Sequence, residues 1–223
     1  MKIAAKIISY LFHPLLLATY LVLVIGKFFP AMLMMISYRH VMLVALFVFA
    51  FTFLFPAINL WLLRTLGSIS SLQLESRHER KQPFVIITIM YVLVAYLFYV
   101  KLPFSANFNK LMTIVAVLVI TATVLTFFIK VSVHSLAMGG WIGILFPLIR
   151  FAPELLWPTA AITVIAGLVI SARLYLNAHT MKEVVIGAAA GVVVGYLGRH
   201  LATAPHEPID TRAPVPVAAP VPR

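Results

Sequence analysis

The sequence contains no cysteine among its 223 residues and only six acidic residues. Without cysteine, the chain can form no disulfide, no thiolate nucleophile and no cysteine-ligated metal cluster. The acidic residues are too few and too scattered for a carboxylate-rich metal cage, so we expect no metal and no other cofactor. They are Glu75, Glu79, Glu154, Glu183, Glu207 and Asp210.

Charge of either sign is also scarce, because charged residues make up 10% of the chain, hydrophobic residues 63%, and the mean hydropathy is +1.06. A charge at the bilayer centre costs at least about 2.5 kcal/mol, so long uncharged intervals mark membrane spans. These intervals are continuously apolar and do not alternate, which favours helices over a barrel. The sequence predicts an all-α, polytopic membrane helix bundle with about six to seven transmembrane helices. The uncharged intervals are 7–26, 40–63, 82–100, 111–129, 131–149, 155–172 and 184–198.

The ends of the chain have different characters. Lys2 and Lys6 precede an apolar run, as in a signal peptide, but His13 and Pro14 interrupt that run and no clear small-residue cleavage site follows. Residues 202–223 are rich in proline and alanine and have no helical period. We therefore expect one transmembrane helical domain over 1–201 and a disordered tail over 202–223.

The formal net charge is +11, from 17 basic and six acidic residues. Basic loops that flank membrane spans next to anionic lipid headgroups explain this excess. The chain has no soluble basic domain, so we expect membrane lipids and no nucleic acid among its partners. Oligomeric state is left open.

Three polar clusters interrupt the apolar sequence: "LQLESRHERKQPF" at 72–84, "KVSVHSLAMGG" at 130–140 and "SARLYLNAHTMKEVVIGAAAG" at 171–191. Two expected spans separate each cluster from the next, so all three should emerge on the same membrane face. Each cluster alone is consistent with an ordinary basic loop or a helix-end histidine. Together they gather cations and imidazoles at one surface, which predicts an anionic, phosphorylated ligand.

The third cluster has the most specific spacing. His179 and Glu183 are four residues apart, so on a helix the carboxylate can orient one ring nitrogen and leave the other for chemistry. Arg173 can meet the same ligand only if the chain turns before His179, and Asn177 is a suitable turn residue. A stripe of small residues for close helix packing then follows Glu183 at four-residue steps: Gly187, Gly191 and Gly195.

These residues resemble a known family, the type 2 phosphatidic acid phosphatase superfamily of lipid phosphate phosphatases. The family's third motif reads Ser-Arg, five residues, His, three residues, Asp, three residues, Gly. Its second motif is Pro-Ser-Gly-His, of which Ser132 and His134 are present without the proline and glycine. Its first motif, Lys, six residues, Arg-Pro, has only a loose counterpart in the basic residues near Pro83. The third motif is matched in register by Arg173, His179, Glu183 and Gly187, with Glu in place of Asp.

The resemblance covers about residues 72–195 and implies metal-independent phosphoryl transfer. His179 is implied as the nucleophile that forms a phosphohistidine, Glu183 as the group that orients it, and His134 as the general acid and base. The implied phosphate-binding residues are Arg173, Arg77, Arg80, Lys81 and Ser132. The implied substrate is a lipid phosphate or diphosphate, such as polyprenyl diphosphate, phosphatidic acid, phosphatidylglycerol phosphate or a lipid A phosphate.

A different class of function stays open, because the incomplete first and second motifs also fit a non-catalytic lipid-phosphate binding or transport protein. A membrane scaffold without a site is a third reading. The orientation in the membrane can be predicted from the basic residues. The cluster face carries nine lysine and arginine residues and the opposite face eight. Without the four proposed cationic phosphate ligands, the cluster face keeps five against eight. The positive-inside rule then predicts an outward-facing site. We expect a bacterial cytoplasmic membrane.

Overall fold

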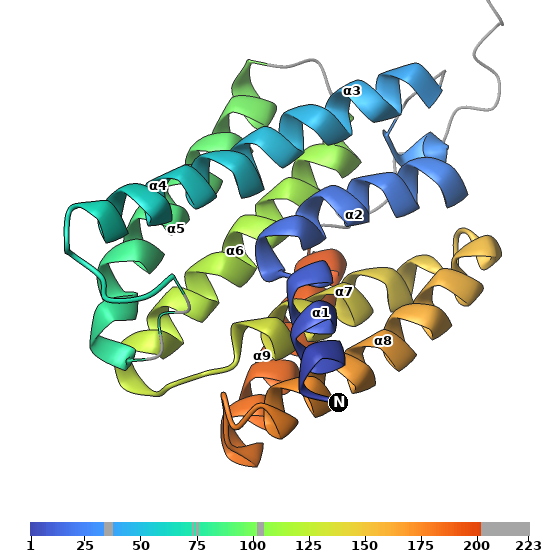
Figure 1. Cartoon of the computed structure of the whole chain (residues 1–223). Helices are drawn as coiled ribbons and strands as arrows, with labels where there is room; N and C mark the ends of the chain where they lie inside the picture. The colour runs from blue at the N-terminus through green and yellow to red at the C-terminus, as the bar shows by residue number, and fades with distance from the viewer. Residues whose placement is uncertain (34–37, 73, 75, 102–104, 202–223) are drawn as a thin grey trace, which may run out of the picture.

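The computed structural model describes residues 1–33, 38–72, 74, 76–101 and 105–201. Within these ranges the chain is helical and has no strand, which confirms the expected all-α bundle (Figure 1). The expected disordered tail at 202–223 lies outside the described residues. The helices are α1 (Lys2–Leu11), α2 (Pro14–Phe28), α3 (Tyr38–Phe49), α4 (Phe55–Thr65), α5 (Arg77–Val100), α6 (Ala106–Phe128), α7 (Val133–Leu148), α8 (Leu156–Tyr175) and α9 (Met181–Leu201).

Each expected apolar interval coincides with one of these helices or with two consecutive helices. Five helical runs are long and apolar enough to cross a membrane, and α1 with α2, bent by 59° at their junction, makes a sixth if the pair is one span. The interval 131–149 forms α7, which has 16 residues and is shorter than a full span. The chain is therefore a polytopic integral membrane protein. The five runs are Arg39–Thr65, His78–Val100, Ala106–Phe128, Pro153–Tyr175 and Met181–His200.

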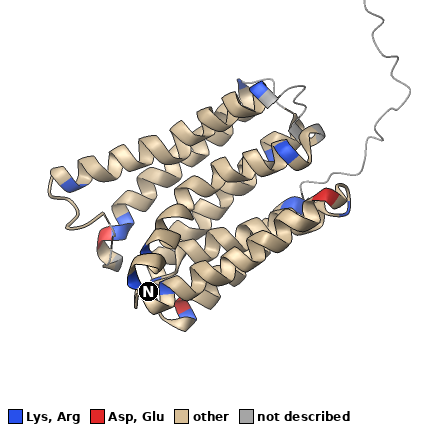
Figure 2. Ribbon diagram, turned by 45° about the vertical axis from the view of Figure 1, so that its right-hand side comes forward, with Lys and Arg blue, Asp and Glu red and all other residues tan. Residues whose placement is uncertain are grey.

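Charged residues lie at the ends of the helices. In Figure 2 the lysine, arginine and acidic residues colour the helix ends and the connections, while the middle of the bundle is uncharged. Polar N-caps start the helices at these ends: Ser76 accepts a hydrogen bond from the Glu79 amide before α5, and Ser105 accepts one from the Phe108 amide before α6. The caps fix where the polar connections give way to apolar spans.

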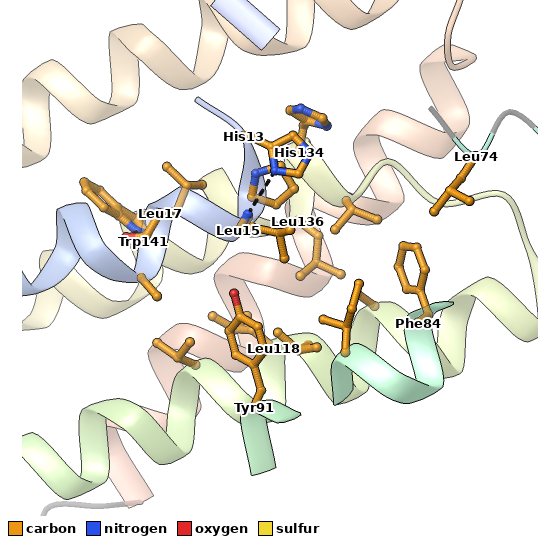
Figure 3. A pocket seen from close by; sticks show the side chains of 18 of the residues that line it. His13, Leu15, Leu17, Leu74, Phe84, Tyr91, Leu118, His134, Leu136 and Trp141 are labelled. Atoms are coloured by element: carbon orange, nitrogen blue, oxygen red, sulfur yellow. Dashed lines mark hydrogen bonds between the residues drawn. The ribbon is translucent and has the colours of Figure 1, made fainter. Parts of the chain in front are cut away.

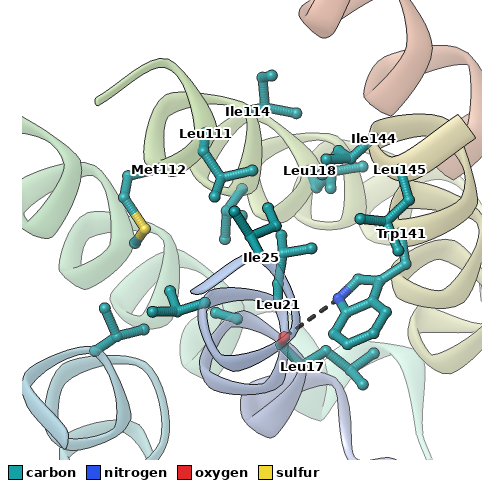
Figure 4. Close-up of a cluster of buried hydrophobic side chains, with 14 of the residues drawn as sticks. Leu17, Leu21, Ile25, Leu111, Met112, Ile114, Leu118, Trp141, Ile144 and Leu145 are labelled. Carbon is teal, nitrogen blue, oxygen red and sulfur yellow. Dashed lines mark hydrogen bonds between the residues drawn. The ribbon is translucent and has the colours of Figure 1, made fainter. Parts of the chain in front are cut away.

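Helix α7 lies at the centre of the bundle and packs most closely against α9. The expected glycine stripe makes this contact: a Cβ on Gly187 would lie 2.6 Å from the Ser132 carbonyl oxygen, and one on Gly195 would lie 2.5 Å from the Gly140 oxygen. The prediction of close packing along the stripe is confirmed. On its other side α7 meets α2, where the Trp141 indole Nε1–H donates to the Leu17 carbonyl at 3.2 Å (Figure 4).

Helix α1 turns away from α2 and packs against α8, so it crosses the end of the bundle that carries the polar clusters (Figure 1). The turn falls at His13, and Pro14 occupies the first position of α2, where its missing N–H costs no hydrogen bond. Because of this turn, residues of α1 form one wall of the polar end of the bundle.

Candidate active site

The third cluster is built around the turn between α8 and α9. Asn177 has a φ of 51°, in the left-handed region that asparagine tolerates. The Ala178 amide donates to the Arg173 carbonyl at 3.1 Å, which closes the end of α8. The turn brings Arg173 and His179 to one cavity, and the prediction that Asn177 forms it is confirmed.

His179 lies two residues before α9 begins and not on the helix itself, but the expected pair with Glu183 is present. The His179 Nδ1–H donates to Glu183 Oε2 at 2.8 Å. The same oxygen accepts from the Thr180 amide at 3.2 Å, and Thr180 Oγ1 accepts from the Glu183 amide at 3.4 Å. This reciprocal arrangement is a capping box, so the helix start itself fixes the carboxylate that orients His179.

The ring nitrogens of His179 are therefore distinguished. A carboxylate only accepts, so the neutral ring carries its proton on Nδ1 and its lone pair on Nε2. The pKa of His179 is lowered to about 4, mainly by burial; the hydrogen bond to Glu183 opposes this shift, and the nearby Arg80 and Arg173 add to it. Near neutral pH the ring is uncharged, and Nε2 is available as a nucleophile.

The first cluster contributes Arg80, which is buried. Its Nε–H donates to the Leu74 carbonyl at 2.6 Å and its Nη1–H to the Val131 carbonyl at 3.3 Å. Arg80 therefore links the connection before α5 to the segment that precedes α7 by hydrogen bonds. Arg173 differs, because its Nε is buried and has no hydrogen-bond partner. A buried donor without a protein partner can donate to a ligand or a water molecule in the cavity.

The second cluster contributes His134, near the start of α7. Its Nε2–H donates to the Ser9 carbonyl of α1 at 3.1 Å. A carbonyl only accepts, so Nε2 keeps its proton and Nδ1 is the nitrogen left to exchange one. The rings of His134 and His13 meet edge to face with centroids 5.5 Å apart.

Three of the predicted phosphate ligands are placed differently from the rest. Ser132 is fully buried, and its Oγ accepts from the amide of Ser135 at 3.4 Å and from the hydroxyl of the same residue at 2.9 Å, as the cap of α7. Lys81 lines neither of the two cavities described below. Its ammonium lies 5.7 Å from the centroid of the Phe127 ring. Arg77 begins α5, and its side chain lies outside the described part of the chain.

Two adjoining cavities meet at the polar clusters. One is polar, has a volume of about 530 Å³ and includes Lys6, Tyr10 and Lys130 in its wall. The other is mainly apolar, has a volume of about 160 Å³ and extends between α2, α5, α6 and α7. His179 lines the apolar cavity at its polar end. The residues that line both are His13, Leu72, Arg80, His134 and Arg173.

The apolar cavity follows one face of α5 into the bundle. Arg80, Phe84, Ile87 and Tyr91 line it at steps of four, three and four residues, a distance of about 16 Å along the helix. Figure 3 shows the two histidines on one side and Phe84, Leu118 and Tyr91 on the other. We call this apolar cavity the apolar channel. A cationic end that continues into the channel matches a ligand with an anionic head and a hydrocarbon chain.

Sequence reasoning missed His13, Lys6 and Lys130 as parts of the site. His13 carried a usable signal, because a His-Pro pair that interrupts an otherwise apolar segment is unexpected. The lysines carried none, since lysines beside membrane spans are common. Within the described residues, no group of three or more His, Asp or Glu side chains is arranged to hold a metal ion.

Comparison of the chain with protein-family models, with curated proteins and with solved structures finds no match in any of the three.

Proposed function

We propose that this integral membrane protein is a phosphatase that hydrolyses a lipid phosphate or diphosphate through a phosphohistidine on His179, and that it is a divergent member of the type 2 phosphatidic acid phosphatase superfamily. One observation carries the proposal. The His179–Glu183 pair opens onto a cavity whose cationic end joins an apolar channel.

In the first step, His179 Nε2 attacks phosphorus in line with the bond to the lipid oxygen. The N–P bond forms as the P–O bond to the lipid breaks. His134, which must first take up a second proton together with the anionic substrate, gives its Nδ1 proton to the departing oxygen, while the Ser9 carbonyl holds the Nε2 proton. Arg80 and Arg173 neutralise the charge that develops on the non-bridging oxygens.

In the second step, water attacks phosphorus and His134 Nδ1 takes its proton. The N–P bond breaks, His179 regains its lone pair, and inorganic phosphate leaves. Because Glu183 and the Ser9 carbonyl each hold one imidazole proton, both rings present a fixed nitrogen throughout. The hydrogen-bond partners therefore support different roles for the two histidines, His179 as the nucleophile and His134 as the acid–base catalyst.

The substrate in this proposal is a lipid, because a soluble phosphate ester would leave the apolar channel unfilled. The channel runs inward from the cations between α2, α5, α6 and α7. A chain lying in it would be held by packing contacts and not by removal from water, because a lipid tail is already in hydrocarbon before it binds. In this proposal the distribution of lysine and arginine turns this end of the protein outward. A small single-domain enzyme of this type suits a bacterial cytoplasmic membrane.

The test is phosphate release from a panel of lipid mono- and diphosphates by the detergent-purified protein in EDTA. We expect release in the chelator and its loss in His179→Ala and His134→Ala. If no lipid in the panel releases phosphate while lipid phosphate still binds, the protein is a binder or transporter and the proposal is wrong.

A further inference from the structure

His13 lies between α1 and α2 and belongs to none of the three polar clusters. Its Nδ1 accepts a hydrogen bond from the Leu15 amide at 3.4 Å, which makes His13 the N-cap of α2. A ring nitrogen that accepts a hydrogen bond carries no proton. The neutral ring therefore carries its proton on Nε2 and offers an N–H donor.

The surroundings of His13 are those of the site. It lines both cavities together with Arg80, Arg173 and His134, and its ring stands edge to face against the His134 ring at 83° (Figure 3). The cap alone does not account for the residue, because serine, threonine, aspartate or asparagine are the residues that usually cap a helix. An imidazole adds a second nitrogen that the cap does not use.

We propose that His13 is a phosphate-binding residue, whose Nε2–H donates a hydrogen bond to a non-bridging oxygen of the substrate phosphate. This inference rests on the proposed function and adds a third histidine to it. Because the donor ring is neutral, it contributes a hydrogen bond without adding charge beside Arg80 and Arg173. The capping bond fixes the ring in place, so the donor is oriented before substrate arrives.

His13→Asn separates the two roles of the side chain. The asparagine Oδ1 can accept from the Leu15 amide and keep the cap, but the variant has no Nε2–H. We expect unchanged thermal stability in detergent, weaker binding of the lipid phosphate and a fall in kcat/KM of roughly tenfold to hundredfold, because the donor contacts the phosphate both in the bound substrate and in the transition state. His78→Asn, at an exposed histidine of α5, is the matched control and should behave like the wild type.

The outcomes distinguish this inference from the proposed function. If the wild type hydrolyses a lipid phosphate and His13→Asn does so within about twofold, at equal stability, the His13 assignment is wrong and the phosphatase stands. If the wild type hydrolyses nothing, the phosphatase fails, and the affinity of the two proteins for a lipid phosphate in detergent decides: weaker binding by His13→Asn supports the donor, and equal binding overturns it. If His13→Asn does not fold, His13→Ser, which also caps, takes its place; loss of folding in both makes His13 a structural residue only.

Discussion

The contact between α7 and α9 gives a quantitative prediction for Gly191→Ala. A Cβ at this position would collide with the Leu136 carbonyl oxygen and lie 2.7 Å from the Gly140 nitrogen and 2.9 Å from the Leu136 carbonyl carbon. All three are backbone atoms, so no side-chain rotation relieves the overlap and the helices must separate. Overpacking of this kind costs about 1–3 kcal/mol.

Gly167→Ala provides the matched control, because a Cβ on Gly167 in α8 has no heavy atom within 4 Å. Both substitutions gain the same helix propensity, about 0.5–1 kcal/mol. That gain cancels when the two variants are compared, so the difference isolates the helix contact. The free energy of unfolding of Gly191→Ala should be lower than that of Gly167→Ala by about 1–3 kcal/mol.

Reversible unfolding in mixed detergent and SDS micelles, followed by far-UV circular dichroism, measures this difference. Equal unfolding free energies for the two alanine variants would refute the close α7–α9 contact. That contact also supports the site, because the Ser132 amide at the start of α7 donates to the Glu183 carbonyl at 3.2 Å.

Further predictions concern the chemistry of the site. In the proposed mechanism His179 attacks as a neutral imidazole, and its pKa is lowered from 6.5 to about 4. The acid limb of kcat/KM against pH should therefore fall through about 4, and a midpoint near 6.5 would contradict this. Arg80→Lys should lose roughly tenfold to hundredfold in kcat/KM, whereas Lys81→Ala should stay within about twofold, because Arg80 lines the cavities and Lys81 does not. Equal losses in the two variants would place both side chains at the phosphate. Ala137→Leu narrows the apolar channel and should raise KM several-fold for a long-chain substrate but not for a short-chain one, and equal effects on both would argue against a chain in the channel.

Much of the bundle was predictable because the bilayer imposes it. Uncharged runs of about 20 residues must satisfy their backbone hydrogen bonds internally, so their positions predict the helices. The prediction that the three polar clusters share one end followed from counting spans, and it is confirmed where Arg80, His134 and Arg173 line one cavity. The catalytic roles assigned to these residues stay predictions.

The choice between neighbouring basic residues needed more than counting. Arg80 and Lys81 follow each other on α5, and successive residues of a helix point about 100° apart, so both cannot face one cavity. The apolar residues Phe84, Ile87 and Tyr91 share the Arg80 face, a pattern already present in the sequence. Helical phase would have favoured Arg80 over Lys81.

The contribution of α1 could not be predicted. The Ser9 carbonyl meets His134 across 125 positions of sequence, and the contact depends on the 59° bend between α1 and α2. No hydrophobic period specifies the direction of such a bend, because it is set by the packing of α1 against α8. The burial of Ser132 as a cap also depends on where α7 begins, and helix boundaries are poorly specified by apolar patterns.

The most direct test of the account is a search for covalent phosphate on His179. Trypsin should release residues 174–182, in which His179 is the single histidine. The wild-type protein, quenched in alkali during turnover of a lipid phosphate, should carry an acid-labile phosphate on this peptide, and His179→Ala should carry none. Turnover that proceeds without phosphate on this peptide, or with phosphate on the peptide that contains His134, would contradict the proposed mechanism.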